Sequence, residues 1–247
     1  MCKGDNNNVK IEIIGNEGIV GNSTFELFRR LGYKVTGSDK NDKINCADIY
    51  FICTPESIVG EVVEKLIGNK TLMQNNALVV IRSTVTPGTC KGLAKRTGYA
   101  HICSNPEFLR EAVALQDEFN PCRIIIGECC KEHGQILEQI YKPLQCPIVR
   151  TDTVTSELTK LACNNYLSCI ISYWNTIEEI AERLGVSGHE VGMIASLDPR
   201  IGSYGSRFHN KFDGRCLPKD TRQLIEFAEK MGCNPVLLEA VEEINEG

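Results

Sequence analysis

One cysteine stands in a segment whose residue types suit covalent chemistry: Cys216, in FDGRCLPKD at residues 212–220. Pro218 follows closely, and proline is favoured at the first position of a helix. Apolar residues at helical spacing come after it. A cysteine just before a helix N-terminus, with Arg215 and Lys219 nearby, is expected to have a lowered pKa. The residues alone leave two interpretations open, a reactive nucleophile and a structural cysteine in a loop.

Three pairs of polar residues are spaced four apart, which places both members on one face wherever the backbone is helical. They are Glu107 and Glu111, Lys160 and Asn164, and Cys216 and Asp220. A Lys/Asn pair on a helix is usually solvated. Lys160, however, is flanked by LT and LAC, so we expect its amine to be half-buried, as functional amines often are.

A second candidate site is the segment IGNEGIVG, between the first predicted strand and the first predicted helix. Aligned on Gly18 and Gly21, it reads N-x-G-x-x-G, with Asn16 at the tight-turn position, where asparagine tolerates the left-handed conformation. Gly18 would admit a pyrophosphate and Gly21 would let the helix pack on the strand. Asp39, at the end of the second predicted strand, would bind the ribose hydroxyls and favour NAD over NADP. The alternative is a domain of this fold that has lost its cofactor.

The elements that position these residues follow from the periodicity. Short apolar runs predict strands at 9–15, 33–39, 47–55, 76–84, 99–106 and 122–127, alternating with helical patterns. Such alternation predicts a parallel sheet covered on both faces. After about residue 153 only helical patterns follow. We therefore predict a Rossmann-like, doubly wound α/β domain at 1–152 and an all-helical domain at 153–247.

Composition excludes several classes of protein. The 247 residues carry a net charge of −5 without a long basic run, which disfavours nucleic-acid and anionic-membrane partners. No apolar segment is long enough to span a bilayer, and the N-terminus lacks a secretory core. The 13 cysteines are odd in number and irregularly spaced, which favours a reducing cytoplasm. Without a C-x-x-C motif and with scattered histidines, no metal site is expected.

Several segments together resemble the UDP-glucose/GDP-mannose dehydrogenase family. They are STVTPGT (83–89), NPEFLREAVALQDEFNPCRIIIG (105–127), SELTKLACNNYLSCIISYWNTIEEIA (156–181), LDPRIG (197–202) and FDGRCLPKD. Members of this family oxidise the C6 hydroxyl of a nucleotide sugar twice with NAD, giving a uronic acid. The resemblance implies a nucleotide-sugar substrate, UDP-glucose before others, and a homodimer formed through the helical domain.

The resemblance also implies roles for individual residues. Cys216 would hold the substrate as a thiohemiacetal and then as a thioester, and Lys160 would stabilise the oxyanion with Asn164 beside it. Asp220 would orient a water, and Glu107 would be the general base that hydrolyses the thioester. Thr84 would lie near the nicotinamide and the catalytic water. The matching cofactor positions are Asn16, Gly18, Val20, Gly21, Asp39, Thr54, Thr84, Glu111 and Lys219. The matching substrate positions are Glu107, Phe108, Leu109, Lys160 and Asn164.

The sequence also departs from the family. Its loop before the cysteine is usually Gly-Phe-Gly-Gly-Ser-Cys, whereas this chain has KFDGRC, with Lys211, Asp213 and Arg215 as the replacements. The sequence ends where the family's connecting helix begins, so the C-terminal domain that grips the nucleotide is not part of it. Two alternatives follow: a catalytically impaired NAD-binding or partner-binding remnant, and a hydroxyacid or 6-phosphogluconate type of dehydrogenase. The latter would not need a cysteine such as Cys216.

Overall fold

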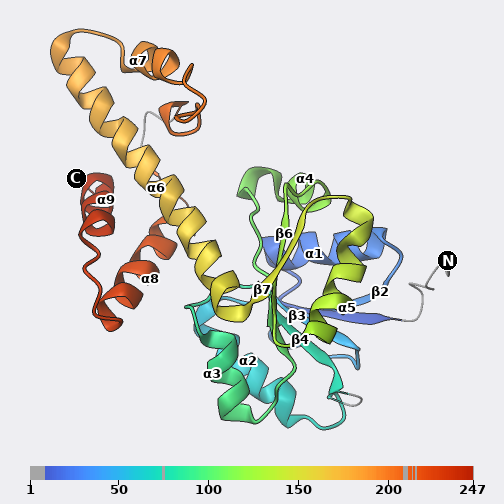
Figure 1. The fold of residues 1–247 in the computed structure, drawn as a ribbon. Coiled ribbons are helices and arrows are strands. Elements are labelled where there is room, and N and C mark those ends of the chain that lie inside the picture. The colour runs from blue at the N-terminus through green and yellow to red at the C-terminus, as the bar shows by residue number, and fades with distance from the viewer. Residues whose placement is uncertain (1–8, 74–75, 208–210, 213, 215, 247) are drawn as a thin grey trace. The chain divides into compact units, whose positions relative to one another are not determined.

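The structure is a computed structural model that describes residues 9–73, 76–207, 211–212, 214 and 216–246. The chain divides into two compact units, Met1–Lys160 and Leu161–Gly247 (Figure 1). No helix in these described ranges is long and apolar enough to cross a membrane.

The first unit is built on one seven-stranded sheet with the order β2-β1-β3-β4-β5-β6-β7. Its strands are β1 (Lys10–Ile14), β2 (Lys34–Ser38), β3 (Ile49–Ile52), β4 (Leu78–Ile81), β5 (Ile102–Ser104), β6 (Ile124–Glu128) and β7 (Ile148–Asp152). From β1 the chain moves outward to β2 and then returns to β3 on the other side. In such sheets the ligand crevice lies at this reversal, outside the carboxyl ends of the strands.

The sheet is parallel except where β5 meets β6. There the strands run antiparallel, with Ser104 opposite Gly127. The connection between them passes through a 3₁₀ turn at Glu111–Val113 and the short helix α4 (Ala114–Phe119). It ends on the side where β5 ends, so β6 runs back along the sheet. The predicted doubly wound fold is confirmed, with a sheet that is mostly rather than wholly parallel.

Helices cover both faces of the sheet (Figure 1). They are α1 (Ile19–Arg30) and α5 (Lys131–Tyr141) on one face and α2 (Glu56–Gly68) and α3 (Thr89–Thr97) on the other. The packing of β3 on both of its faces explains why its sequence is apolar throughout. Ile49 and Phe51 pack in one apolar cluster and Tyr50 and Ile52 in the other, because successive side chains of a strand point to opposite faces.

The described residues of the second unit form helices joined by turns and irregular segments, and none of them is in a strand. It contains most of α6 (Thr153–Leu184), together with α7 (Gly188–Ala195), α8 (Cys216–Lys230) and α9 (Val236–Glu246). Ile171, Phe212 and Val241 form its small apolar core. The predicted absence of strands after residue 153 is confirmed for the part of the chain described here.

Helix α8 begins two residues earlier than the sequence predicted. Cys216 is its first residue and Pro218 its third. Proline is tolerated there because the first N–H groups of a helix have no intrahelical acceptor. Cys216 therefore belongs to the first helical turn and not to the loop before it.

Candidate functional site

The glycine turn after β1 leaves room for a ligand at one position and none at another. A Cβ atom added to Gly21 would lie 2.0 Å from the carbonyl oxygen of Gly15, so α1 can approach β1 only with glycine there. A Cβ on Gly18 would meet only that oxygen, at 3.4 Å. Packing within the chain therefore explains Gly21, while the openness at Gly18 fits the approach of a pyrophosphate.

The tight turn itself is made by Gly15 and not, as the sequence predicted, by Asn16. Gly15 has φ +91, whereas Asn16 is not among the described residues with positive φ. Glycine adopts this region without the steric cost that any side chain brings.

Asp39 lies beside this turn, at the end of β2. Its carboxylate accepts hydrogen bonds from the backbone N–H groups of Glu17 (3.2 Å) and Lys40 (2.9 Å). The N-terminus of α1 has Gly18 as its cap, without a side-chain cap, and no acidic residue in its first turn. These features together suit a bound phosphate and ribose.

Two buried polar atoms at the carboxyl ends of β1 and β3 lack a hydrogen-bond partner. They are Oδ1 of Asn16 and Oγ1 of Thr54. A buried polar atom without a partner costs free energy, so such atoms mark places where a ligand supplies one. Both lie where the order of the strands reverses, and with the glycine turn and Asp39 they fit a dinucleotide.

Thr84 follows β4, close to the end of β3. The neighbouring Ser83 hydroxyl donates to the backbone oxygen of Thr54 at 2.5 Å. Val20 is the second residue of α1. Thr84 and Thr54 thus lie on adjacent strand ends, as their predicted nearness to a cofactor requires.

Lys160 is almost completely buried, where the sequence predicted a half-buried amine. Its side chain is 5% exposed and that of Glu107 is 9%, with Nζ and Oε1 3.1 Å apart. The other carboxylate oxygen of Glu107 accepts the N–H of Leu109 at 2.6 Å. The ion pair offsets the cost of burying the ammonium, which allows a charge at this depth.

The aromatic ring of Phe108 adds to this cluster. Lys160 Nζ lies 5.3 Å from the ring centroid and Arg123 Cζ lies 4.1 Å from it. Cations over an aromatic face are stabilised by the ring quadrupole. The segment Glu107–Phe108–Leu109 thus holds two cations close to a carboxylate.

A buried polar network lies next to this segment and includes Asn105, two residues before Glu107. The sequence analysis did not predict it. Arg82 donates to both carboxylate oxygens of Glu118 at 2.6 Å and to Oδ1 of Asn105 at 2.7 Å. Tyr141 donates to the same Asn105 oxygen. Burial is the largest single effect and lowers the pKa of Arg82, but Glu118 and the other neighbouring acidic groups together outweigh it and the pKa is raised overall. The available signal was an arginine inside the apolar run LVVIRST.

Glu111 does not share a helical face with Glu107. Residues 105–110 are irregular, and Glu111 is exposed at the start of the 3₁₀ turn. The helical backbone that a shared face requires is therefore absent for this pair, whereas the other two pairs lie on α6 and α8.

In the second unit, α6 and α8 are joined by a buried amide–carboxylate contact. Asn164 Nδ2 donates to Asp220 Oδ2 at 2.6 Å, and Asp220 is 1% exposed. Asn165 donates to the backbone oxygen of Asp220 at 3.1 Å. Lys219 Nζ lies 2.5 Å from the other carboxylate oxygen. Asp220 therefore has a fixed orientation, one helical turn after Cys216.

Cys216 is exposed at the start of α8, whose first turn contains no acidic residue. The loop before it is anchored by Phe212, which packs on Ile171 and Val241. Lys211 donates to the backbone oxygen of Glu246 at 3.1 Å. The replacements Asp213 and Arg215 lie outside the described residues.

A doubly wound sheet, a glycine turn beneath a helix N-terminus and an acid ending β2 define a Rossmann-type dinucleotide-binding domain, here followed by helices. Models of the UDP-glucose/GDP-mannose dehydrogenase family match its NAD binding domain to residues 42–145 and its central domain to residues 154–247. The chain belongs to this family, and NAD is the cofactor of the matched domain.

Individual relatives of this chain support the assignment to this family. The UDP-glucose 6-dehydrogenase of Rickettsia conorii is 36% identical over 213 residues, covering 81% of this chain and 49% of the relative. UDP-glucose 6-dehydrogenase TuaD of Bacillus subtilis is 34% identical over 225 residues, covering 85% and 48%. The chain thus spans about half the length of these curated relatives.

Solved structures share the fold. A UDP-glucose dehydrogenase from Pyrobaculum islandicum superposes with a TM-score of 0.90 at 28% identity, over 100% of this chain and 70% of that one. A 3-hydroxyisobutyrate dehydrogenase from Mycobacterium tuberculosis has a TM-score of 0.78 at 14% identity, covering 96% of this chain and 92% of that one. The second likeness shows the fold alone and gives no support to a hydroxyacid substrate.

Proposed function

We propose that this chain carries the catalytic machinery of an NAD-dependent nucleotide-sugar 6-dehydrogenase, which converts UDP-glucose to UDP-glucuronate through a covalent bond to Cys216. One observation carries the proposal: each unit buries a polar pair of the kind this reaction needs. Lys160 contacts Glu107 in the first unit, and Asn164 contacts Asp220 in the second. Burial of such groups costs free energy, and functional sites are where that cost is commonly met.

The cofactor-binding part consists of groups on the first unit. The N–H groups at the start of α1 would bind the pyrophosphate at Gly18, and Asp39 would accept hydrogen bonds from the ribose hydroxyls. Asn16 and Thr54 would find in the cofactor the partners that they lack within the chain. When bound, NAD supplies the hydride acceptor for each of two oxidations. A carboxylate at Asp39 would repel the extra phosphate of NADP.

Cys216 would retain the substrate between the two oxidations. Its thiolate adds to the aldehyde carbon, forming a carbon–sulfur bond and an oxyanion. Loss of hydride from that carbon leaves a thioester, and attack by water then breaks the carbon–sulfur bond and releases the carboxylate. A thiolate is the best nucleophile available near neutral pH, and its position at the start of α8 favours the anion.

The buried polar groups would serve the charges that develop in these steps. The ammonium of Lys160 would stabilise the oxyanion, and the amide of Asn164 would donate a hydrogen bond to the same oxygen or to a water. Asp220, held by Asn164 and Lys219, would orient that water. Glu107 would take the proton of the water that hydrolyses the thioester.

We further propose a cytoplasmic homodimer. The described cysteines form no disulfide with one another, which fits a reducing compartment. Large apolar side chains are exposed on the second unit: Tyr166, Tyr173, Ile180, Ile194, Leu197, Val236 and Leu237. Such a number of exposed apolar groups on a small helical unit indicates a protein interface.

A turnover assay tests the proposed function. Purified protein is given NAD with UDP-glucose, GDP-mannose or a UDP-N-acetylhexosamine, and NADH is followed together with the sugar product. We expect UDP-glucose to be preferred, with two NADH formed per sugar oxidised. Binding of NAD in calorimetry, with no turnover of any of these sugars, would instead assign the chain as an impaired NAD-binding remnant.

A further inference from the structure

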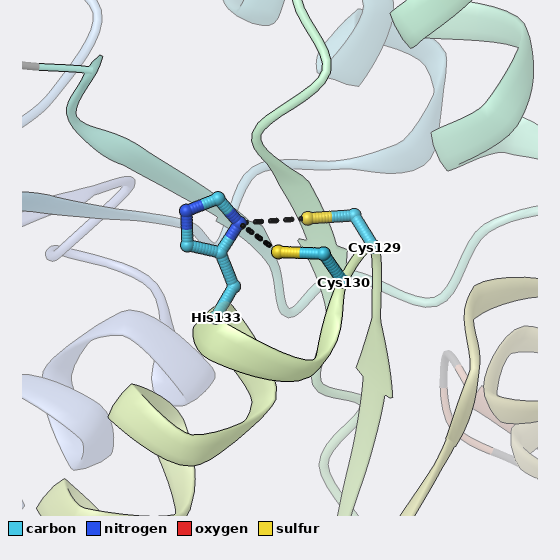
Figure 2. Close-up of side chains that lie close together, drawn as sticks. All are labelled: Cys129, Cys130 and His133. Atoms are coloured by element: carbon cyan, nitrogen blue, oxygen red, sulfur yellow. Dashed lines mark hydrogen bonds between the residues drawn. The ribbon is translucent and has the colours of Figure 1, made fainter.

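Three sulfur and nitrogen ligands come together at the start of α5. His133 Nδ1 lies 3.0 Å from the sulfur of Cys129 and 3.2 Å from that of Cys130. All three ligand atoms lie within 4.8 Å of one another, and both thiols point at the same imidazole nitrogen (Figure 2). None of these residues takes part in the proposed dehydrogenase reaction.

The backbone explains why residues spaced C-C-x-x-H converge. Strand β6 ends at Glu128, and Cys130 is the N-cap of α5 with an extended backbone. His133 is the third residue of that helix. Side chains at the N-cap and third positions lie side by side, as in a capping box, so Cys130 meets His133 by local geometry alone.

A second layer of contacts orients these ligands. His133 Nε2 lies 3.3 Å from His101 Nδ1, so the nitrogen that faces away from the thiols has its own hydrogen-bond partner. The buried Cys103 donates its S–H to the sulfur of Cys129 at 3.5 Å and accepts the N–H of Cys129 at 3.4 Å. Metal-binding histidines commonly have such an outer partner, which selects the tautomer and holds the ring.

We propose that Cys129, Cys130 and His133 bind a zinc-class divalent ion through two thiolates and Nδ1, with the fourth position open to water. Two sulfurs and one imidazole form a known zinc ligand set. Tetrahedral bond lengths of about 2.3 Å to sulfur and 2.0–2.1 Å to nitrogen require ligand atoms roughly 3.5–3.8 Å apart. The observed 3.0 and 3.2 Å separations reach this range by small side-chain rotations at the surface.

The site is separate from the cofactor turn. Because β6 runs antiparallel to β5, the carboxyl end of β6 lies on the same side of the sheet as the amino end of β5. The turn at Gly15–Gly18 lies on the other side of the sheet, at the carboxyl ends of β1, β3, β4 and β5. A metal here would fasten the β6–α5 connection and the residues around His101, so its effect would be on binding and stability rather than on hydride transfer.

Cobalt substitution of the metal-stripped protein tests the proposal directly. Protein treated with a chelator and a reductant is titrated with Co²⁺, which shows thiolate charge-transfer bands and intense visible bands when bound tetrahedrally. We expect one Co²⁺ per chain, displaced by one equivalent of Zn²⁺. Zn²⁺ should also raise the melting temperature and protect Cys129 and Cys130 from iodoacetamide without protecting Cys233.

Variants separate this site from general thiol binding. The outer variant His101→Ala should lower the affinity for cobalt by about 10- to 100-fold. Cys129→Ser, Cys130→Ser and His133→Ala should each abolish the charge-transfer bands or lower the affinity further than that. Cys46→Ser, at an exposed cysteine of the same unit, should bind cobalt unchanged. Absence of the bands in the wild-type protein overturns the proposal, as does binding that survives all three ligand variants or is lost with Cys46→Ser.

Discussion

Lys160 Nζ and Glu107 Oε1 lie 3.1 Å apart although 53 residues separate them in the chain, and both side chains are almost excluded from solvent. This pair joins the start of α6 to the segment that follows β5. A buried cation can stabilise an oxyanion, and a carboxylate in contact with it can take a proton from water. Variants of this pair therefore test the proposed reaction most directly.

Replacing Glu107 with Gln should halt the reaction at the thioester intermediate on Cys216. The amide keeps the size of the side chain but cannot take a proton from water, so hydrolysis should slow by about 10²- to 10⁴-fold. Intact-protein mass spectrometry with NAD and UDP-glucose should then find the acyl group on the Cys216 peptide. Turnover at the wild-type rate, with no adduct, would remove Glu107 from the role of base.

Breaking the Arg82–Glu118 pair should destabilise the first unit strongly. Both side chains are buried, so Glu118→Ala leaves an uncompensated guanidinium, at a cost of about 3–5 kcal/mol. Urea unfolding measures the loss. The surface pair Arg96–Glu64 provides the control, because Glu64→Ala should cost no more than about 1 kcal/mol. Equal losses in the two variants would show that the buried network does not stabilise the fold.

Replacing Asp39 with Ala should weaken NAD binding more than NADP binding. The variant lacks the carboxylate proposed to accept hydrogen bonds from the ribose hydroxyls, and with it the repulsion of a 2′-phosphate. Calorimetry with both cofactors on wild type and variant gives the ratio. A wild-type protein that binds the two equally well would contradict the assigned role, as would a variant whose two affinities fall by the same factor.

Cys216 should be alkylated early by limiting iodoacetamide, ahead of cysteines such as Cys90 and Cys103, which are buried. Cys129 serves as an internal reference. Its pKa is lowered to about 5, chiefly by the hydrogen bond from Cys103 and further by His133, while burial opposes the change. NAD with UDP-glucose should slow labelling of Cys216 and leave Cys129 unaffected in peptide mapping.

The same thiol has a kinetic test. Cys216→Ser should abolish or stall the second oxidation, because a hydroxyl is a poorer nucleophile and an ester hydrolyses more slowly than a thioester. Cys233→Ser, at another exposed cysteine, should leave the rate unchanged. If Cys216 reacts no faster than the buried thiols and its serine variant turns over normally, the covalent mechanism fails.

Light scattering at micromolar concentration should give the mass of a dimer. Tyr173, Leu237 and their neighbours expose apolar side chains on the second unit, and a partner would remove them from water. Tyr173→Glu should shift the mass toward the monomer, whereas Lys95→Glu on α3 should not. A monomeric wild-type protein would refute the proposed homodimer.

Local patterns in the sequence were enough to predict most elements of this fold. Apolar runs and helical spacing depend on neighbouring residues, so β1, α1 and the long helix α6 follow from them directly. The glycine-rich segment after β1, Asp39 after β2 and the nearness of Cys216 to the start of a helix also follow from local order. The start of α8 was misplaced by two residues because proline is accepted at several positions of a first turn.

Contacts between distant segments required the tertiary structure. Arg82 and Glu118 are 36 residues apart, and Cys103 and Cys129 are 26 apart, so neither pair leaves a periodic signal. The reversal of β6 depends on where the connection after β5 returns to the sheet. The sequence thus determined which segments are helices and strands, because those choices are local. The chain path alone decided which buried charges and thiols meet, because pairing across the fold depends on how the segments pack.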